Sequence, residues 1–262
     1  MAASITYLSP HLDDAVLSCG GLIRRQVISG AQVTVITVFA GQPLDHEISE
    51  YAASLHRLWG SGEETVPQRR REDRTALKWL GATARHLDYL DAIYRSDGNR
   101  FLYVSDQDLF DRPHKLEAKL IDDVAASIPR LLSPADSWLY APLGVGNHVD
   151  HQLVARASMR LLQLTGRVIF YEDYPYVERP GALTTRLEGI GGLGWRPQIE
   201  ALATECIQAK IDAVSSYQSQ LSSLFGGAEK VKTRVTGYAL AISPAEGMAE
   251  RYWHSLPPEI HG

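Results

Sequence analysis

The sequence predicts an α/β fold in which a mostly parallel sheet is covered by helices on both faces. Short apolar runs rich in β-branched and aromatic residues alternate along the chain with longer segments of helical spacing. Such alternation is typical of parallel strands joined by right-handed helical crossovers. We therefore expect a Rossmann-like open sheet with a small C-terminal β addition, formed by residues 1–262 as a single domain.

The predicted strands are short, apolar and bounded by turn-forming residues. They are expected at Ile5–Leu8, Val33–Phe39, Trp138–Ala141 and Val168–Tyr171. Segments with helical spacing follow them, at Asp14–Ser29, Pro67–Leu80, Lys115–Leu132 and His151–Leu164. In open sheets of this kind, ligands bind outside the carboxyl ends of the strands. Functional residues are therefore expected where a strand runs into a helix.

The remaining segments are assigned by composition and periodicity. A further helix is expected over about Gln198–Leu224, and Thr236–Ile242 is predicted to be a late strand. The stretches Ala40–Val66 and Pro180–Pro197 are rich in Gly, Pro and polar residues, so they are expected to be loops able to cover a site. Phe170–Tyr176 is rich in aromatic and acidic residues, which is compatible with a buried strand end or with the lining of the site.

Composition excludes several classes of function. The 262 residues are 45% hydrophobic and 22% charged, which is ordinary for a globular domain. A net charge of -5 leaves no excess of Lys and Arg, so neither nucleic acid nor a membrane surface is an expected partner. We find no signal-peptide pattern and no membrane-spanning run, and therefore expect a cytoplasmic protein. Cys19 and Cys206 are expected to be free thiols, and no pattern indicates an oligomeric state.

The first candidate motif directly follows the first predicted strand. His11, Asp13 and Asp14 come at its end, just before the helical pattern starts. One imidazole with two carboxylates forms a borderline-hard site that suits Zn²⁺ and related divalent ions. The alternative is that Asp13 or Asp14 caps the following helix, where a carboxylate meets free backbone N–H groups. This motif alone does not distinguish the two.

The second motif follows the strand expected at Trp138–Ala141. His148, Asp150 and His151 lie at the start of another helix, so that two imidazoles flank a carboxylate. A lone histidine in such a place is usually a satisfied surface or core residue. Two clusters of metal-binding residue types at the same kind of strand-to-helix junction instead favour one shared metal centre.

Together these motifs resemble those of the PIG-L or LmbE-like zinc de-N-acetylases, a family that acts on N-acetylglucosaminyl phosphatidylinositol and on the glucosamine precursors of mycothiol and bacillithiol. That family carries His-Pro-Asp-Asp-Glu after its first strand and His-Pro-Asp-His later, where this chain has HLDDA at 11–15 and HVDH at 148–151. The resemblance extends over most of the chain. Further similar positions are Arg69, Glu72, Ala76 and Leu80-Gly81 of an Arg-x-x-Glu helix, Leu90-Asp91, and the late segment 210–220.

The resemblance implies a metal site and a base. His11, Asp14 and His151 would bind Zn²⁺, although Fe²⁺ and Co²⁺ accept the same nitrogen and oxygen ligands. Asp13 would be the general base. The implied reaction is hydrolysis of the amide that joins an acetyl (acyl) group to the nitrogen of an N-acetylglucosamine-like sugar. The expected partner is therefore a small-molecule N-acyl amino-sugar conjugate.

Four further residues receive roles from the resemblance. His148 would stabilise the oxyanion or protonate the leaving amine, and Asp150 would orient His148. Arg69 and Asp91 would contact the substrate. Arg69 stands in the run RRRE, which is equally typical of a solvated basic face, and Asp91 is also compatible with a turn carboxylate.

The chain departs from the family pattern at four positions. Ala15 replaces the family's Glu, Leu12 and Val149 replace both motif prolines, and Tyr217 stands where relatives often have His. The proposed ligands and base are intact, so the changes concern the support around the metal and the shape of the substrate pocket.

Other functions compatible with the residues remain open at this point. A phosphoesterase would use similar ligands but needs enough of them for two ions. A metal-binding sugar-recognition protein without catalysis would be consistent with Ala15, although retention of Asp13 argues against it. A nucleotide-binding oxidoreductase is disfavoured, because SPHLDD rather than GxGxxG follows the first strand.

Overall fold

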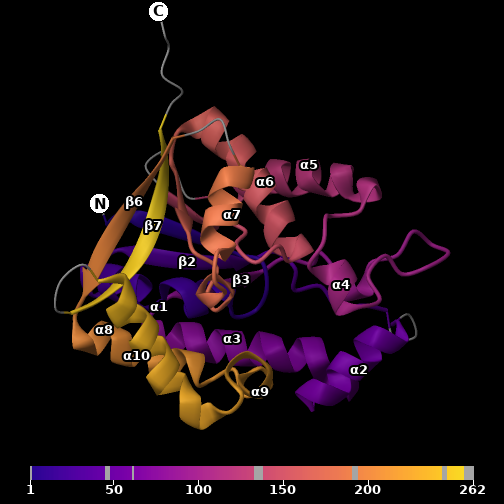
Figure 1. The fold of residues 1–262 in the computed structure, drawn as a ribbon, viewed down its shortest axis with the longest axis horizontal. Coiled ribbons are helices and arrows are strands. Elements are labelled where there is room, and N and C mark those ends of the chain that lie inside the picture. The colour runs from indigo at the N-terminus through magenta and orange to yellow at the C-terminus, as the bar shows by residue number, and fades with distance from the viewer. Residues whose placement is uncertain are drawn as a thin grey trace, which may run out of the picture.

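The computed structural model describes residues 2–44, 48–60, 62–132, 138–190, 194–243 and 247–256. Within them, seven strands form one sheet in the order β3-β2-β1-β4-β5-β7-β6 (Figure 1). The strands are β1 (Ser4–Ser9), β2 (Gln32–Thr37), β3 (Thr83–His86), β4 (Trp138–Pro142), β5 (Val168–Tyr171), β6 (Gly194–Leu202) and β7 (Met248–Leu256).

Strand β1 lies at the centre of the parallel part of this sheet. Its Ile5 pairs in parallel with Val33 of β2 on one side and with Trp138 of β4 on the other. β3 and β5 extend the parallel sheet outwards. β7 then pairs antiparallel with β5, and β6 antiparallel with β7. The predicted mostly parallel α/β sheet with a C-terminal β addition is therefore confirmed.

Helices cover both faces of the sheet, as Figure 1 shows. One face carries α1 (Asp14–Ile28), α3 (Thr65–Leu80), α8 (Thr204–Val214) and α10 (Val231–Ile242). The other face carries α5 (Ala118–Ser127), α6 (Val149–Thr165) and α7 (Ala182–Gly189). Successive strand residues point to opposite faces, so Tyr7 belongs to the first apolar core and Leu8 to the second. This is why the central strand β1 carries buried apolar residues on both of its faces.

Three shorter helices lie beyond the carboxyl ends of the parallel strands. They are α2 (Glu50–Trp59), α4 (Asp106–Leu109) and α9 (Leu221–Phe225). A third apolar cluster, which includes Ala52, Ile93, Leu109 and Val149, joins α2 and α4 to the start of α6. Residues remote in sequence thus surround one end of the sheet.

Several sequence predictions are wrong in the C-terminal part of the chain. Thr236–Ile242 is helical, because Val235, Ala239 and Ile242 bury one helix face against the core. The run Gln198–Leu224 is not one helix: it contains the end of strand β6, then α8 and α9. The periodicity of its first residues, Gln198–Leu202, does not distinguish a helix from a strand. These residues form a strand because they pair with β7.

The two expected loops also contain regular structure. Ala40–Val66 includes α2, and Pro180–Pro197 includes α7 and the start of β6. Cys19 and Cys206 are buried free thiols, as expected. Within the described residues, no helix has both the length and the apolar character required to cross a bilayer.

Candidate active site

Both predicted motifs lie at the carboxyl ends of neighbouring central strands. His11, Asp13 and Asp14 follow β1, whereas His148 and His151 follow β4. From this pair of strands the sheet grows in opposite directions, with β2 on one side and β5 on the other. An open α/β sheet leaves a crevice at such a point, which is where ligands bind.

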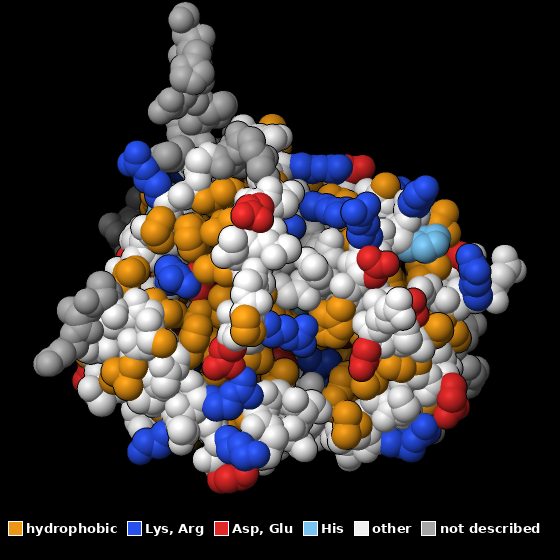
Figure 2. Space-filling model, in the orientation of Figure 1, with side chains coloured by type: hydrophobic (Ala, Val, Ile, Leu, Met, Phe, Trp, Pro, Cys, Tyr) orange, Lys and Arg blue, Asp and Glu red, His pale blue; other side chains and the backbone are white. Residues whose placement is uncertain are grey.

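A cavity of about 190 Å³ opens at this crevice. The space-filling view shows the face hollowed in this region, with hydrophobic side chains around the hollow and Lys and Arg side chains beside it (Figure 2). We call the polar part formed by His11, Asp13, Asp14 and His148, which follow β1 and β4, the floor; Arg69 and Asp91 line the cavity beside it. The rim consists of apolar residues from α2, from α4 and the residue after it, and from α9: Leu55, Leu58, Trp59, Leu109, Phe110 and Leu224.

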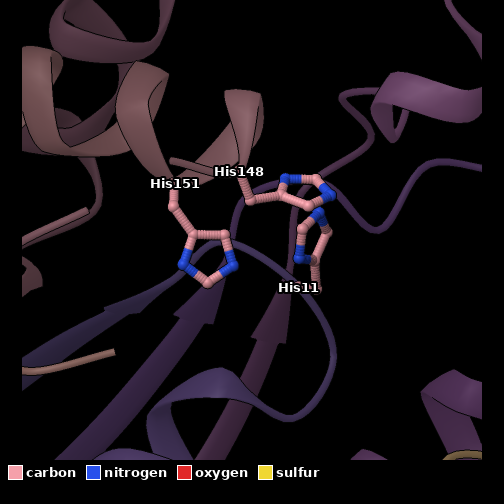
Figure 3. A group of neighbouring side chains, drawn as sticks. All are labelled: His11, His148 and His151. Atoms are coloured by element: carbon pink, nitrogen blue, oxygen red, sulfur yellow. The ribbon is translucent and has the colours of Figure 1, made fainter. Parts of the chain in front are cut away.

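The imidazoles of His11, His148 and His151 converge, as Figure 3 shows. The ring centroid of His11 lies 4.8 Å from that of His148 and 5.3 Å from that of His151. Each residue offers a ring nitrogen within 4.8 Å of the others, and all are buried. Two segments far apart in the sequence thus present nitrogen donors to one point.

Asp14 completes a closer set of donor atoms. Its Oδ2 lies 3.2 Å from His11 Nδ1 and 3.3 Å from His151 Nε2. Two donors that share a tetrahedral ion at roughly 2.0–2.1 Å are about 3.3 Å apart, so these spacings fit a metal ion. His151 Nε2 is moreover buried without a hydrogen-bond partner. A buried, unpartnered ring nitrogen is costly unless another ligand satisfies it.

The opposite ring nitrogens of the same two histidines meet carboxylates. His11 Nε2 lies 2.9 Å from Asp150 Oδ2, and His151 Nδ1 lies 2.6 Å from Asp173 Oδ1. A carboxylate on the far nitrogen fixes the tautomer of a metal-binding histidine and orients its ring. Both histidines are therefore held in the arrangement that metal ligands need.

Asp173 contacts a proposed ligand, His151, although no sequence motif indicated it. It lies two residues after β5, and its Oδ2 accepts hydrogen bonds from the backbone N–H groups of Gly144 and Val145. The available signal was its place in the aromatic and acidic segment Phe170–Tyr176. Both interpretations of that segment hold in part, because Phe170 belongs to a buried strand while Tyr176 lines the cavity.

The position of Asp150 requires a correction. The resemblance implied that its carboxylate orients His148, but Oδ2 faces His11 and Oδ1 accepts a hydrogen bond from Arg95 at 2.6 Å. The backbone N–H of Ala92 also donates to Oδ2 at 3.0 Å. Adjacent residues in the first turn of α6 point in different directions, so the side chain turns away from His148.

His148 is oriented by the backbone instead. Its Nδ1 accepts a hydrogen bond from the N–H of Asp150 at 3.2 Å at the start of α6. In the neutral ring the proton is then assigned to Nε2, which can donate toward the cavity. Burial and the neighbouring His11 hold the pKa of His148 well below its usual range.

Neither aspartate of the first motif caps α1. Asp13 makes no capping hydrogen bond, and the N–H of Ala15 donates to Ser9 Oγ at 3.0 Å. Asp14 Oδ2 accepts the N–H of His11 at 2.7 Å, which lies before the helix. The capping alternative is therefore not supported, and both carboxylates face the cavity.

The Asp13 carboxylate lies in a strongly perturbed environment. Burial and the adjacent Asp14 raise its pKa to about 7, while Arg69 and His11 act in the opposite direction. Arg69 approaches Asp13 Oδ2 to 3.7 Å. A carboxylate with a pKa near neutrality can take up a proton at physiological pH.

Arg69 does not belong to a solvated basic face. Its side chain is 10% exposed, its Nε is buried without a hydrogen-bond partner, and its guanidinium stacks 5.1 Å from the ring centroid of Trp59. The neighbouring Arg70 and Arg71 instead pair outside the cavity, with Asp88 and Glu64. Arg69 therefore offers donors to a ligand in the cavity.

Asp91 makes a turn contact and also faces the cavity. Its Oδ1 accepts the N–H of Ile93 at 3.2 Å, which is a turn contact. Its Oδ2 lies 3.7 Å from His11 Nε2 and 4.0 Å from the guanidinium of Arg69, at the cavity.

The substitutions relative to the family pattern lie around the floor rather than in it. Ala15 packs in the first apolar core, and Tyr217 is buried with its hydroxyl donating to Asp73 Oδ1 at 2.8 Å. Neither is among the described residues that line the cavity. Leu12 and Val149, which replace the motif prolines, are likewise buried.

The sequence of this chain is similar to a known family and to proteins named as deacetylases. The family model "PIG-L: GlcNAc-PI de-N-acetylase" matches residues 6–162. The chain is 30% identical to a 2'-N-acetylparomamine deacetylase of Niallia circulans, with 97% of this chain and 95% of the relative covered. A relative of the same name from Streptomyces fradiae is 30% identical over 81% of this chain and 72% of its own length.

Solved structures extend the likeness to the fold. The zinc-inhibited form of a teicoplanin deacetylase matches with a TM-score of 0.84 and 28% identity, covering 97% of this chain and 98% of that chain. An A40926 pseudoaglycone deacetylase matches with a TM-score of 0.78 and 29% identity, covering 97% of both chains. This chain, with its two motifs at the carboxyl ends of β1 and β4, belongs to the PIG-L (GlcNAc-PI de-N-acetylase) family.

Proposed function

We propose that this protein is a zinc-dependent N-deacetylase that removes the acetyl group from the amide nitrogen of an N-acetylglucosamine-like conjugate. The observation that carries the proposal is the unpartnered, buried Nε2 of His151, which lies 3.3 Å from Asp14 Oδ2. The relatives named as deacetylases of 2'-N-acetylparomamine, of teicoplanin and of A40926 pseudoaglycone support an amino-sugar substrate.

The ion would be held by His11 Nδ1, Asp14 Oδ2 and His151 Nε2. We leave His148 out of the ligand set, although its ring is close enough, because its Nδ1 accepts the Asp150 N–H and the ring proton is then on Nε2. Zn²⁺ suits these ligands, and Fe²⁺ or Co²⁺ would be accepted as well. Such an ion polarises the acyl carbonyl and lowers the pKa of the attacking water.

Asp13 would act as the general base. It lines the cavity beside Asp14 and accepts no hydrogen bond that would hold it as a helix cap. In this role its carboxylate removes the proton of the attacking water as the new carbon–oxygen bond forms. Arg69, 3.7 Å away, would keep the carboxylate oriented.

His148 would act on the opposite side of the reacting amide. Its Nε2–H donates toward the oxygen that becomes negatively charged, or passes its proton to the departing amine. Asp150 would act through His11 rather than through His148, since its carboxylate bonds to His11 Nε2. Arg69 and Asp91 would bind hydroxyl groups of the sugar.

The rival functions are less well supported. A second donor group, formed by His11, Asp91 and Asp150, shares His11 with the first. Both oxygens of Asp150 already accept hydrogen bonds, from Ala92 and Arg95, so a second ion as in a two-metal phosphoesterase is disfavoured. A sugar-binding protein without catalysis has no need for a buried Asp13 beside the metal ligands.

We further propose that residues 1–262 form one catalytic domain, which is supported by the single continuous sheet. A cytoplasmic location and the absence of nucleic-acid and membrane partners stay predictions from composition.

Metal content and amine release test the proposal together. We would measure both on the wild-type protein and on His151→Ala, using 2'-N-acetylparomamine and N-acetylglucosamine glycosides. His254→Ala is a matched control, because His254 lies on β7 outside the cavity. We expect about one zinc per chain and amine release, both lost only in His151→Ala. Two ions per chain, or metal without amine release from any compound, would contradict the proposal.

A further inference from the structure

Gln220 is a buried polar residue in the cavity wall that none of the roles above uses. It is 4% exposed and lines the cavity directly before α9. Its backbone is fixed on both sides, because its N–H donates to Tyr217 O at 2.8 Å and its carbonyl accepts the N–H of Leu224 at 2.9 Å.

A chain of hydrogen bonds connects this residue to α3. Glu72 Oε1 accepts the backbone N–H of Ser219 at 3.0 Å, and Glu72 Oε2 accepts the Ser219 hydroxyl at 2.6 Å. An ionised carboxylate can only accept, so the hydroxyl hydrogen of Ser219 points at Glu72. The segment before α9 is thereby fixed to α3 by both oxygens of one side chain.

This arrangement determines which way the Gln220 amide faces. Gln220 Nε2 lies 3.0 Å from Ser219 Oγ. The hydroxyl hydrogen of Ser219 is donated to Glu72, so Ser219 Oγ can only accept a hydrogen bond from Gln220. Gln220 must therefore turn its NH₂ group toward this oxygen. The amide oxygen of Gln220 then points to the other side, and the described residues donate no hydrogen bond to it.

We infer that Gln220 Oε1 helps to recognise the substrate, by accepting a hydrogen bond from a hydroxyl or from the amide N–H of the N-acyl amino sugar. The inference rests on the proposed function and adds a residue to it. An acceptor held in place on a buried side chain is left unsatisfied by a ligand that lacks the matching donor, so such a group selects among sugars.

The acceptor complements the other polar groups of the cavity. Arg69 and His148 offer donors, whereas Asp13 is engaged as the base in the proposed reaction. Gln220 therefore supplies an uncharged acceptor on the α9 side of the cavity, next to Leu224 of the rim.

Kinetics on the zinc-loaded protein test the inference with 2'-N-acetylparomamine as substrate. Gln220→Leu keeps the size of the side chain and removes the acceptor, so we expect KM to rise about 10-fold or more with kcat changed by less than about 3-fold. Gln218→Leu is the matched control, because Gln218 is exposed on the same turn and donates to Ser215 O.

Monodeoxy analogues of methyl N-acetylglucosaminide identify the donor. If a sugar hydroxyl donates to Gln220, the wild-type protein should discriminate against the analogue that lacks this hydroxyl, and Gln220→Leu should lose that discrimination. If the amide N–H donates instead, Gln220→Leu should raise KM equally for all analogues. Ser219→Ala removes the group that fixes the amide, and we expect a smaller rise in KM, of about 3-fold.

Binding of the deacetylated product separates this inference from the deacetylase proposal. We would measure by calorimetry the Kd of paromamine for the zinc-loaded wild type, Gln220→Leu and Gln218→Leu. Weaker binding by Gln220→Leu alone supports the acceptor even if no compound is hydrolysed, in which case only the deacetylase proposal fails. Equal KM and Kd in Gln220→Leu and wild type overturn the inference. A wild type that neither hydrolyses nor binds any compound overturns both.

Discussion

The floor of the cavity differs from its rim in how its side chains are held. In the floor and directly behind it, His11 meets Asp14 and Asp150, and His151 meets Asp14 and Asp173, each within 3.3 Å. The rim consists of apolar side chains from short helices, and Leu58 is 60% exposed. Catalysis needs side chains that are held as firmly as those of the floor, since small displacements of reacting groups lower the reaction rate strongly. The rim can change without disturbing it.

The two regions also differ in where their residues come from. The floor residues follow β1 and β4, strands buried on both faces, so the backbone that carries them is rigid. The rim residues lie on or directly after α2, α4 and α9, helices of ten residues or fewer. Substitutions in the floor should therefore affect turnover and metal binding, and substitutions in the rim should affect substrate affinity.

Loss of the proposed base should have the largest effect. Asp13→Ala removes the group that takes the proton of the attacking water, and we expect kcat to fall by roughly 10²–10⁴-fold. Zinc content should stay near the wild-type value, because Asp13 is not a proposed ligand. Elemental analysis and single-turnover kinetics provide the test, and unchanged kcat on a verified substrate would remove Asp13 from the mechanism.

Removal of the carboxylate behind His151 should weaken the metal site. Asp173→Asn loses the charge that orients the ring, and we expect zinc affinity to fall by about 10–100-fold in competition with a chelator. Asp91→Asn is the control, because Asp91 also lies near a proposed ligand, His11, at 3.7 Å but is placed in substrate binding. Equal zinc affinities in both variants and wild type would show that Asp173 only holds the loop at Gly144.

Arg69 lies between the two regions, since it contacts Asp13 of the floor and stacks on Trp59 of the rim. Arg69→Met keeps much of the stacking but removes the donors, so we expect KM to rise about 10–100-fold, as for loss of a charged hydrogen bond. Arg69→Lys should recover part of that loss because it keeps the charge. A change in kcat alone would instead assign Arg69 to orienting Asp13.

A change confined to the rim should have the smallest effect. Leu58→Ser alters an exposed side chain, so we expect the free energy of unfolding to change by less than about 0.5 kcal/mol and kcat to stay the same. KM should change by less than about 5-fold. Within that range the change should be larger for substrates with an apolar aglycone than for substrates without one. A fall in zinc content would contradict the separation of rim and floor.

Much of the fold was predictable because the signals are local. The strands at Ile5–Leu8 and Val168–Tyr171 were found from short apolar runs, since both faces of these strands are buried. Strand β3 was not singled out, because Thr83–His86 is polar and half-exposed at the sheet edge. Thr236–Ile242 was predicted as a strand and is helical, because a short apolar run does not specify its own period.

The sequence by itself determined the types of residue at the site and the strand ends where they stand, because motif spacing and strand position are local properties. It thereby placed His11, Asp14 and His151 near one another without describing their surroundings. Only the tertiary structure decided which carboxylate faces each ring nitrogen, since His11 and Asp150 are separated by 139 positions and His151 and Asp173 by 22. The same holds for Gln220, whose amide is oriented by Glu72, because hydrogen bonds between remote segments depend on packing that no local pattern encodes.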